Sequence, residues 1–238
     1  QEPRITNLLM RGDFLKPGGQ VTPGVPEFLH PLPPESVPNR LAFARWLVDA
    51  RSPTTARSFV NRVWQAYFGT GLVPTSEDLG SQGEPPSHPE LLDWLAVELM
   101  EPATSGVKPW SMKHLHRLIV TSRTYRMAST PDEKNLAADP DNRWIWRVPS
   151  RRMEAELVRD GILYVAGKLD LSFGGPDIDY ALGLTVNRRS LYFRHAQEKQ
   201  MEFLKMFDCA AVTECYQRKE SIVPQQALAL ANSELTLV

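Results

Sequence analysis

The chain has 238 residues, of which 42% are hydrophobic, and its formal net charge is -1. This length allows one large domain, and the apolar fraction is enough for a sizeable core. The nearly balanced charge argues against nucleic-acid or membrane-surface binding driven by bulk charge. No apolar run approaches the roughly 20 residues that a membrane-spanning helix needs.

The two ends of the chain give little information about its compartment. The sequence begins at Gln1 and stops inside an apolar run at Val238, so we expect both ends to belong to a longer polypeptide. The lack of a signal peptide therefore does not decide the localisation. The two cysteines, Cys209 and Cys215, do not decide whether the compartment is oxidising or reducing. In an oxidising compartment they could form a disulfide.

The first part of the chain differs in composition from the rest. Residues 1–38 are rich in proline and glycine, which predicts an extended arm or a linker from a preceding domain, with one short strand at 5–9. From residue 39 onwards apolar residues recur at helical spacing, and we expect one helical domain over 39–238. Helices are predicted from about Asn39, from Ser52 to Gly69, from Ser87, from Trp110 to Ser122, from Ser150 to about Leu169, and from Pro224.

Local signals define some of these helix starts. Ser87 and Glu90 form a capping box, and Pro89 suits the first turn because its missing N–H costs nothing there. Ser111 is a plausible N-cap of the next helix. The segment 190–195 alternates enough to be a strand and could pair with 5–9. The predicted fold is mainly α, a multi-helix globular domain with a minor β pair and a Pro/Gly-rich N-terminal arm.

The predicted helix from Ser150 carries the densest charge. Arg152, Glu156 and Arg159 would share one face at i, i+4 and i+7, and Asp160 follows directly. One interpretation is a solvated row of weak ion pairs. The alternatives are a polar network that binds an anionic ligand, because arginine grips carboxylate or sulfate bidentately, and an inter-domain contact.

A second polar segment runs from 208 to 225. It contains Asp208, Glu214, Arg218, Glu220 and Gln225 in a loop that leads into the last helix. Polar loops on a rigid scaffold often form sites, although a loop stapled by its own hydrogen bonds would have the same composition. We expect this segment to lie near the charged helix and to form a cleft for an anionic or hydroxyl-rich ligand.

Other candidates for chemistry are scattered. Asn61, in a helix rich in aromatic residues, must be hydrogen-bonded if buried, and it either fixes a loop or, with Arg62, contacts a ligand. His195 is the best single acid or base candidate. His114 and His116 would point apart on a regular helix, so no metal site is predicted. Of six tryptophans, Trp46, Trp64 and Trp94 are expected in the core, whereas Trp144 and Trp146 are placed where exposure would allow sugar stacking.

Ordered blocks of the sequence carry a family resemblance. They include Phe59-Val-Asn-Arg-Val-Trp64 and Val223-Pro-Gln-Gln-Ala-Leu-Ala-Leu230, together with residues 40–47, 68–73, 83–95, 110–122, 124–126, 139–142, 146–156 and 215–233. In these blocks the chain resembles the planctomycete PSD-one domain, a domain of unknown function. The resemblance covers about residues 39–233.

The resemblance implies an extracytoplasmic, multidomain setting but no catalytic residues. Members usually lie C-terminal to a second domain and often to a cytochrome-c-like module, so haem c would lie elsewhere in the polypeptide. The chain itself has no C-x-x-C-H haem motif. Two classes of function follow: an accessory or interaction module that docks preceding domains or binds polysaccharide, and a catalytic domain, oxidoreductase or carbohydrate-active, coupled to the haem module.

Overall fold

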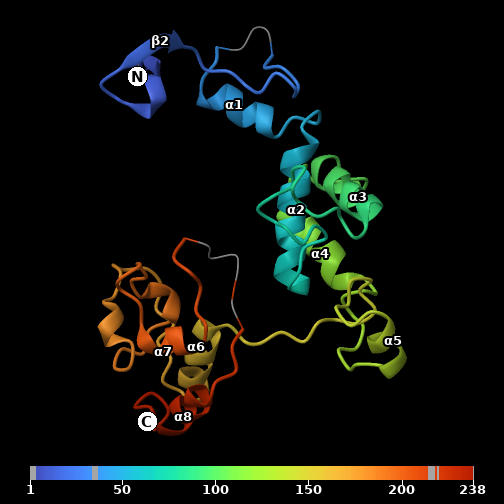
Figure 1. The fold of residues 1–238 in the computed structure, drawn as a ribbon. Helices are drawn as coiled ribbons and strands as arrows, with labels where there is room; N and C mark the ends of the chain where they lie inside the picture. Colours follow the sequence, from blue (N-terminus) through green and yellow to red (C-terminus); the bar gives the residue numbers. More distant parts are fainter. Residues whose placement is uncertain (1–3, 34–36, 214–217, 219, 238) are drawn as a thin grey trace. The chain divides into compact units, whose positions relative to one another are not determined.

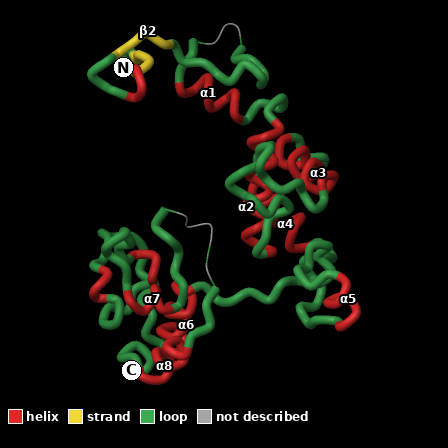
Figure 2. Tube along the Cα trace, viewed as in Figure 1, coloured by secondary structure: helices red, strands yellow, loops and turns green. Residues whose placement is uncertain are grey.

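The computed structural model describes residues 4–33, 37–213, 218 and 220–237, and the chain divides into two compact units, residues 1–150 and 151–238 (Figure 1). Helices make up most of the regular structure (Figure 2), which confirms the predicted mainly α class. The predicted arm, residues 1–38, belongs to the first unit, and its boundary with a following domain stays a prediction. None of the described helices is long and apolar enough to cross a membrane.

The arm contains the minor β pair, but with a different partner from the one predicted. Strand β1 (Thr6–Leu9) pairs antiparallel with β2 (Pro17–Val21) through the 3-10 turn Met10–Gly12. The expected partner, 190–195, instead contains the 3-10 helix Ser190–Tyr192, so that part of the prediction is wrong. A local hairpin closes a much shorter loop than a pairing across the chain, and its entropy cost is correspondingly smaller.

Five helices follow in the first unit: α1 (Arg40–Leu47), α2 (Pro53–Phe68), α3 (Pro89–Met100), α4 (Met112–Thr121) and α5 (Glu133–Ala138). Side chains cap the starts of α1, α4 and α5. Asn39 accepts a hydrogen bond from the Ala42 N–H at 2.9 Å, and Ser111 caps α4 as predicted. Gly69 ends α2 with a φ of 82°, a conformation that glycine adopts without strain.

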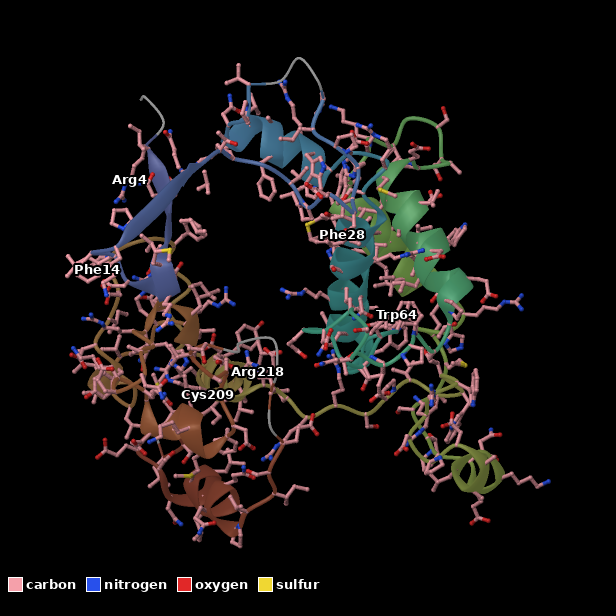
Figure 3. All side chains as sticks on the ribbon, turned by 45° about the horizontal axis from the view of Figure 1, so that its top comes forward. Arg4, Phe14, Phe28, Trp64, Cys209 and Arg218 are labelled. Atoms are coloured by element: carbon pink, nitrogen blue, oxygen red, sulfur yellow. The ribbon has the colours of Figure 1, made fainter. Side chains whose placement is uncertain are left out.

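The core of the first unit forms between α2, α3 and α4. Side chains of α2 and α3 interdigitate with Leu115 and Ile119 of α4, and Trp64 lies within this core (Figure 3). The buried stripe of α2 includes Ala56, Val60 and Val63, as the spacing predicted. Trp94 is a correction: its side chain is 52% exposed, because it lies on the face of α3 opposite to Leu92, Leu95 and Leu99.

The capping box predicted at Ser87 is not formed. Helix α3 begins one residue later than predicted, with His88 at the N-cap and no side-chain cap. Ser87 instead uses both its N–H and its hydroxyl as donors to the carbonyl of Leu72, at 2.8 and 3.3 Å. A tertiary contact between Ser87 and the preceding loop therefore replaces the predicted capping box. Helix α3 itself lies where the spacing of apolar residues predicted a helix.

A buried amide holds that preceding loop against α2. The side chain of Asn61 is 1% exposed, accepts from the Val73 N–H at 2.8 Å and donates to the Val73 carbonyl at 3.0 Å. Gly71 fits beneath it only because it has no side chain, since a Cβ there would lie 2.7 Å from the Asn61 amide. The predicted loop-fixing role of Asn61 is therefore confirmed by its contacts.

The second unit consists of α6 (Ala155–Val165), the 3-10 helices Tyr180–Leu182 and Ser190–Tyr192, α7 (Glu202–Met206) and α8 (Pro224–Asn232). The helix predicted over Ser150–Leu169 is too long at both ends: residues 151–154 are extended, and Gly167 at a φ of 69° follows its last turn. Its core joins Leu163 of α6 to Phe203 and Leu204 of α7 and to Leu235. Much of the unit is irregular chain (Figure 2).

Replacing Asn61 with alanine should destabilise the first unit by about 2 kcal/mol, because the Val73 N–H and carbonyl would stay buried without partners. Urea unfolding of the full chain measures this. The matched control on α2 is Arg57→Ala, which removes only an exposed ion pair with Asp93 and should cost well under half as much. Equal costs for the two variants would contradict the pinning role of Asn61.

Candidate functional site

The two charged segments of the second unit meet in space, as predicted. Arg218 places its Nη1 2.6 Å from Oε2 of Glu156, and its Nη2 lies 3.6 Å from Oε2 of Glu154. Arg152 places its Nη1 3.6 Å from Oδ2 of Asp208. Arginine and carboxylate groups from both segments therefore converge, and each of these charges has an intramolecular partner. Figure 3 labels Arg218 within this unit.

Asp208 organises the turn before the last helix. Its carboxylate accepts from the Ser221 N–H at 2.8 Å and from the Ser221 hydroxyl at 2.8 and 2.9 Å. Its own backbone has a φ of 59°, the left-handed region that aspartate tolerates better than most residues. Asp208 thus joins the end of α7 to the segment that leads into α8.

Gln226, which the sequence reading did not select, connects this turn to α6. Its Nε2 donates to the carbonyls of Met206 and Ser221 at 2.9 and 3.2 Å, and its Oε1 accepts from Arg152 at 2.5 Å. Gln226 is 5% exposed. Its position as the third residue of a helix opened by Pro224 was the available signal, because Gln there reaches back to the helix start.

The predicted helical row of Arg152, Glu156 and Arg159 does not exist as such. Arg152 precedes α6 and extends toward α8, so it shares no helical face with the other two. Arg159 is 0% exposed and donates to three backbone carbonyls: Nε to Gly183 at 2.9 Å, Nη1 to Arg188 at 2.8 Å and Nη2 to Val186 at 2.6 Å. Burial lowers the pKa of this guanidinium, and the neighbouring Asp160 opposes that shift.

Asp160 completes the same cluster from the next position of α6. One carboxylate oxygen accepts from both the N–H and the hydroxyl of Ser190 at 2.7 Å, and it lies 3.7 Å from Nη1 of Arg159. The other oxygen is 3.5 Å from the half-exposed Arg189. Arg159 and Asp160 therefore hold the irregular segment 183–190 against α6, and both of their charged ends are occupied within the protein.

The remaining candidates are not part of this cluster. Asn61 and Arg62 belong to the first unit, where Arg62 is exposed on α2. His195 donates from Nε2 to the carbonyl of Ala210 at 2.9 Å, which gives it a structural contact. Glu220 is exposed. Glu214 lies outside the described residues, as does Cys215, so the open question of a Cys209–Cys215 disulfide is not addressed.

Cys209, labelled in Figure 3, is the described cysteine of the second unit. Burial raises the pKa of its thiol, and the negative charge of Glu156 adds to that shift. A raised pKa keeps the sulfur protonated at neutral pH, and a protonated thiol is a poor nucleophile. Cys209 therefore fits a packing role at the edge of the core of the second unit better than a catalytic one.

Beside the charged cluster, α7 and α8 form an open apolar groove. Its volume is about 470 Å³. Five apolar residues line it: Leu184, Phe203, Met206, Leu228 and Ala229. Four polar residues complete the lining: Glu202, Gln225, Asn232 and Ser233. Gln225 is the one of these residues that the sequence had given as a candidate site residue. The volume lies within the range of ligand pockets, and the lining suits an apolar group better than an anion.

The first unit contains a buried acid–base pair that the sequence analysis missed. Nε2 of His114 lies 2.8 Å from Oε1 of Glu98, and the other carboxylate oxygen accepts from the Ala103 N–H at 3.2 Å. The His114 contact holds the pKa of Glu98 below its usual value, against the effect of burial. His116 instead contacts the Tyr67 hydroxyl at 2.8 Å, so the two histidines do point to different partners, as predicted.

Metal binding and covalent haem attachment each require a specific set of donor side chains. Across the described ranges, no three His, Cys, Asp or Glu side chains lie close enough together to hold a metal ion. The sequence has no C-x-x-C-H motif, and its cysteines are six positions apart. We therefore assign no step in this chain to such a group.

Comparison with known proteins gives a family but no relative of known activity. The family PSD1, described as "Protein of unknown function (DUF1553)", matches residues 39–238. No curated protein and no solved structure matches the chain significantly.

Replacing Arg159 with lysine should destabilise the protein by about 3–5 kcal/mol, because an ammonium cannot reach three separate carbonyls and leaves buried acceptors unpaired. Thermal and urea unfolding of the full chain measure this loss. Arg189→Lys is the control, since Arg189 is half-exposed and shares the same Asp160. A fully stable Arg159→Lys variant would contradict the structural role.

The Glu98–His114 pair should give the stability a defined pH dependence. Because folding lowers the pKa of Glu98, its contribution is present above the unfolded pKa of about 4.3 and is lost as the pH falls through the folded value. Glu98→Gln should therefore be less stable than the wild type at pH 7, and the difference should shrink below about pH 4. Urea unfolding across pH 3–7 tests this, and a difference independent of pH would refute it.

Proposed function

Because the chain belongs to the PSD1 family, whose members are proteins of unknown function, its role has to be argued from its own residues, and we propose that it is an accessory binding module. The observation that carries the proposal is the contrast within the second unit. The arginines and carboxylates of the cluster pair with one another or with backbone groups. The adjoining groove is apolar and open.

The hydrogen bonds of the charged cluster hold α7 and α8, the two helices that line the groove, in position. Gln226 lies on α8 and binds the carbonyl of Met206 at the end of α7, while Arg152 holds Gln226 from the start of α6. These hydrogen bonds set the distance between the two helices whose apolar side chains line the groove. Nη1 of Arg152 is buried and has no hydrogen-bond partner among the described residues, so it is held only by the ion pair with Asp208 at 3.6 Å. The other hydrogen bonds of this buried network restrict its surroundings.

We propose that an apolar segment from a preceding domain of the same polypeptide occupies this groove. Leu228 is 59% exposed and Leu184 is 39% exposed, although both are large apolar residues in its lining. Covering exposed apolar surface with a partner removes it from water, which lowers the free energy of the system. The polar groups among the lining residues would orient the segment by hydrogen bonds, as in helix-in-groove recognition.

The wider setting that fits this module is an extracytoplasmic, cell-surface polypeptide with a cytochrome-c-like module in another domain. The support is the resemblance of the ordered sequence blocks to a family with that organisation. A polysaccharide is the external ligand that we propose for it. The formal net charge of -1 is compatible with a neutral ligand and offers no attraction for nucleic acid.

The alternative class, a catalytic domain coupled to the haem module, predicts a different result in one experiment. The full-length protein would be mixed with a panel of soluble polysaccharides, and its haem absorption spectrum and product formation would be followed. Reduction of the haem that depends on a polysaccharide would establish the catalytic alternative. Binding without reduction or cleavage supports the accessory role.

Leu228→Glu should abolish docking in the groove, because a carboxylate would have to lose its water against an apolar partner. In wild-type full-length protein, we expect amide hydrogen exchange in α7 and α8 to be slower than in the isolated 238-residue chain. Leu228→Glu should remove that difference. Leu230→Glu is the matched control, since it lies on the same helix, is 45% exposed and is not in the groove lining. Equal exchange in the two wild-type proteins would refute groove docking.

A further inference from the structure

We infer that Trp144, presented by the loop 139–147 of the first unit, is the stacking platform on which this chain binds a sugar ring of a neutral polysaccharide. The inference rests on the proposed function and adds the residue that contacts the ligand. The loop follows α5, in the yellow-green part of the chain (Figure 1). Trp144 is 64% exposed, whereas Trp46 and Trp64 are nearly fully buried.

The loop is built with a strained backbone around Trp144. Asn142 and Ile145 both have positive φ angles, 55° and 54°. The left-handed conformation is a genuine outlier for a β-branched residue such as Ile145, and each such residue costs about 1–3 kcal/mol. Ile145 packs against the core of the first unit, which gives a reason for its own strain to be tolerated. The strain at these two positions fixes the direction of the backbone on either side of the exposed tryptophan.

Hydrogen bonds from polar side chains hold this conformation. Asp139 accepts from the N–H groups of Arg143 and Trp144 at 2.9 and 2.8 Å, and its backbone carbonyl accepts from the Trp146 indole at 2.9 Å. Asn142 donates to the Arg147 carbonyl at 2.9 Å and accepts from its N–H at 3.2 Å. These five hydrogen bonds therefore anchor a short loop on which the side chain of Trp144 remains exposed to solvent.

A ring beside Trp144 further restricts its orientation. The imidazole of His88 lies 5.7 Å from the indole, centroid to centroid, at an interplanar angle of 79°. Nδ1 of His88 contacts the Ser87 hydroxyl at 3.0 Å. Within the described part of the chain, Nε2 of His88 forms no hydrogen bond, so this nitrogen can form one with a ligand hydroxyl.

These features suit a pyranose ring better than a protein partner. A sugar ring has an apolar C–H face, which stacks on an aromatic face, and a rim of hydroxyls that need hydrogen-bonding groups nearby. The exposed sequence neighbours of Trp144, Asp141 and Arg143, are polar and of opposite charge. A protein interface would instead require a larger apolar surface.

Native affinity electrophoresis of the 238-residue chain in gels containing xylan, galactomannan, hydroxyethyl cellulose or dextran tests the inference. We expect the wild type to be retarded by at least one of these polysaccharides and the affinity of Trp144→Ala to be about tenfold weaker. Trp144→Phe should keep most of the affinity, because it retains an aromatic face. The control is Trp94→Ala, since Trp94 is 52% exposed but lies on a regular helix, and it should bind like the wild type.

The outcomes separate this inference from the broader proposal. Retardation of Trp144→Ala equal to that of the wild type would overturn the platform and leave polysaccharide binding in place. No retardation of the wild type in any gel would overturn the platform and the polysaccharide ligand together, while groove docking is decided by hydrogen exchange. The melting temperature of each variant is expected to stay within a few degrees of the wild type, because both tryptophans are largely exposed.

Discussion

The second unit depends on a buried arginine that donates hydrogen bonds to backbone carbonyls, which in a sheet would be bound by a neighbouring strand. Between α6 and α7 the chain forms little regular structure, and its carbonyl groups would be left without partners if they were simply buried. Arg159 supplies donors to the carbonyls of Gly183, Val186 and Arg188, and Asp160 supplies acceptors to Ser190. One turn of one helix thereby provides partners for a mostly irregular segment, whose own β-type contact is a single bridge between Arg188 and Asp170. The aromatic face of Phe193 covers the guanidinium at 4.7 Å.

The first unit solves a similar problem with a neutral side chain. Asn61 binds both the N–H and the carbonyl of Val73. These are the two backbone groups that a neighbouring strand would bind, so the loop between α2 and α3 is satisfied without one. A neutral amide loses less hydration free energy on burial than a guanidinium does, so it needs fewer compensating contacts. In both units, polar side chains on a helix fix irregular chain. The surfaces proposed for binding are held by other contacts: Gln226 between α7 and α8 at the groove, and Asp139 and Asn142 in the loop that carries Trp144.

The charged cluster and the proposed binding surfaces have different roles. In the cluster, attraction between Arg218 and Glu156 and the hydrogen bonds of Gln226 stabilise the protein's own geometry. At the groove and at Trp144, apolar groups remain exposed on supports that are held rigidly. Rigid, exposed apolar groups bind at a lower entropy cost than flexible ones, because less conformational freedom is lost on contact. This division of roles is the physical basis for the proposal that the chain is a binding module.

The sequence by itself determined the helical class, the approximate helix positions and the buried stripe of α2, because apolar spacing and capping are local signals. The sequence also predicted, from charge complementarity, that the two charged segments meet, which the tertiary contacts then established. It also gave Asn61 as a loop anchor or a ligand contact, and Trp144 and Trp146 as aromatics placed for exposure; the structure exposes Trp144, whereas the indole of the half-buried Trp146 binds the Asp139 carbonyl. Only the tertiary structure decided that Ser87 binds Leu72, that Gln226 rather than Gln225 joins the cluster, and that Arg159 is fully buried. The partners in these contacts include backbone carbonyls, which every residue possesses, so no residue type in the sequence marks them in advance.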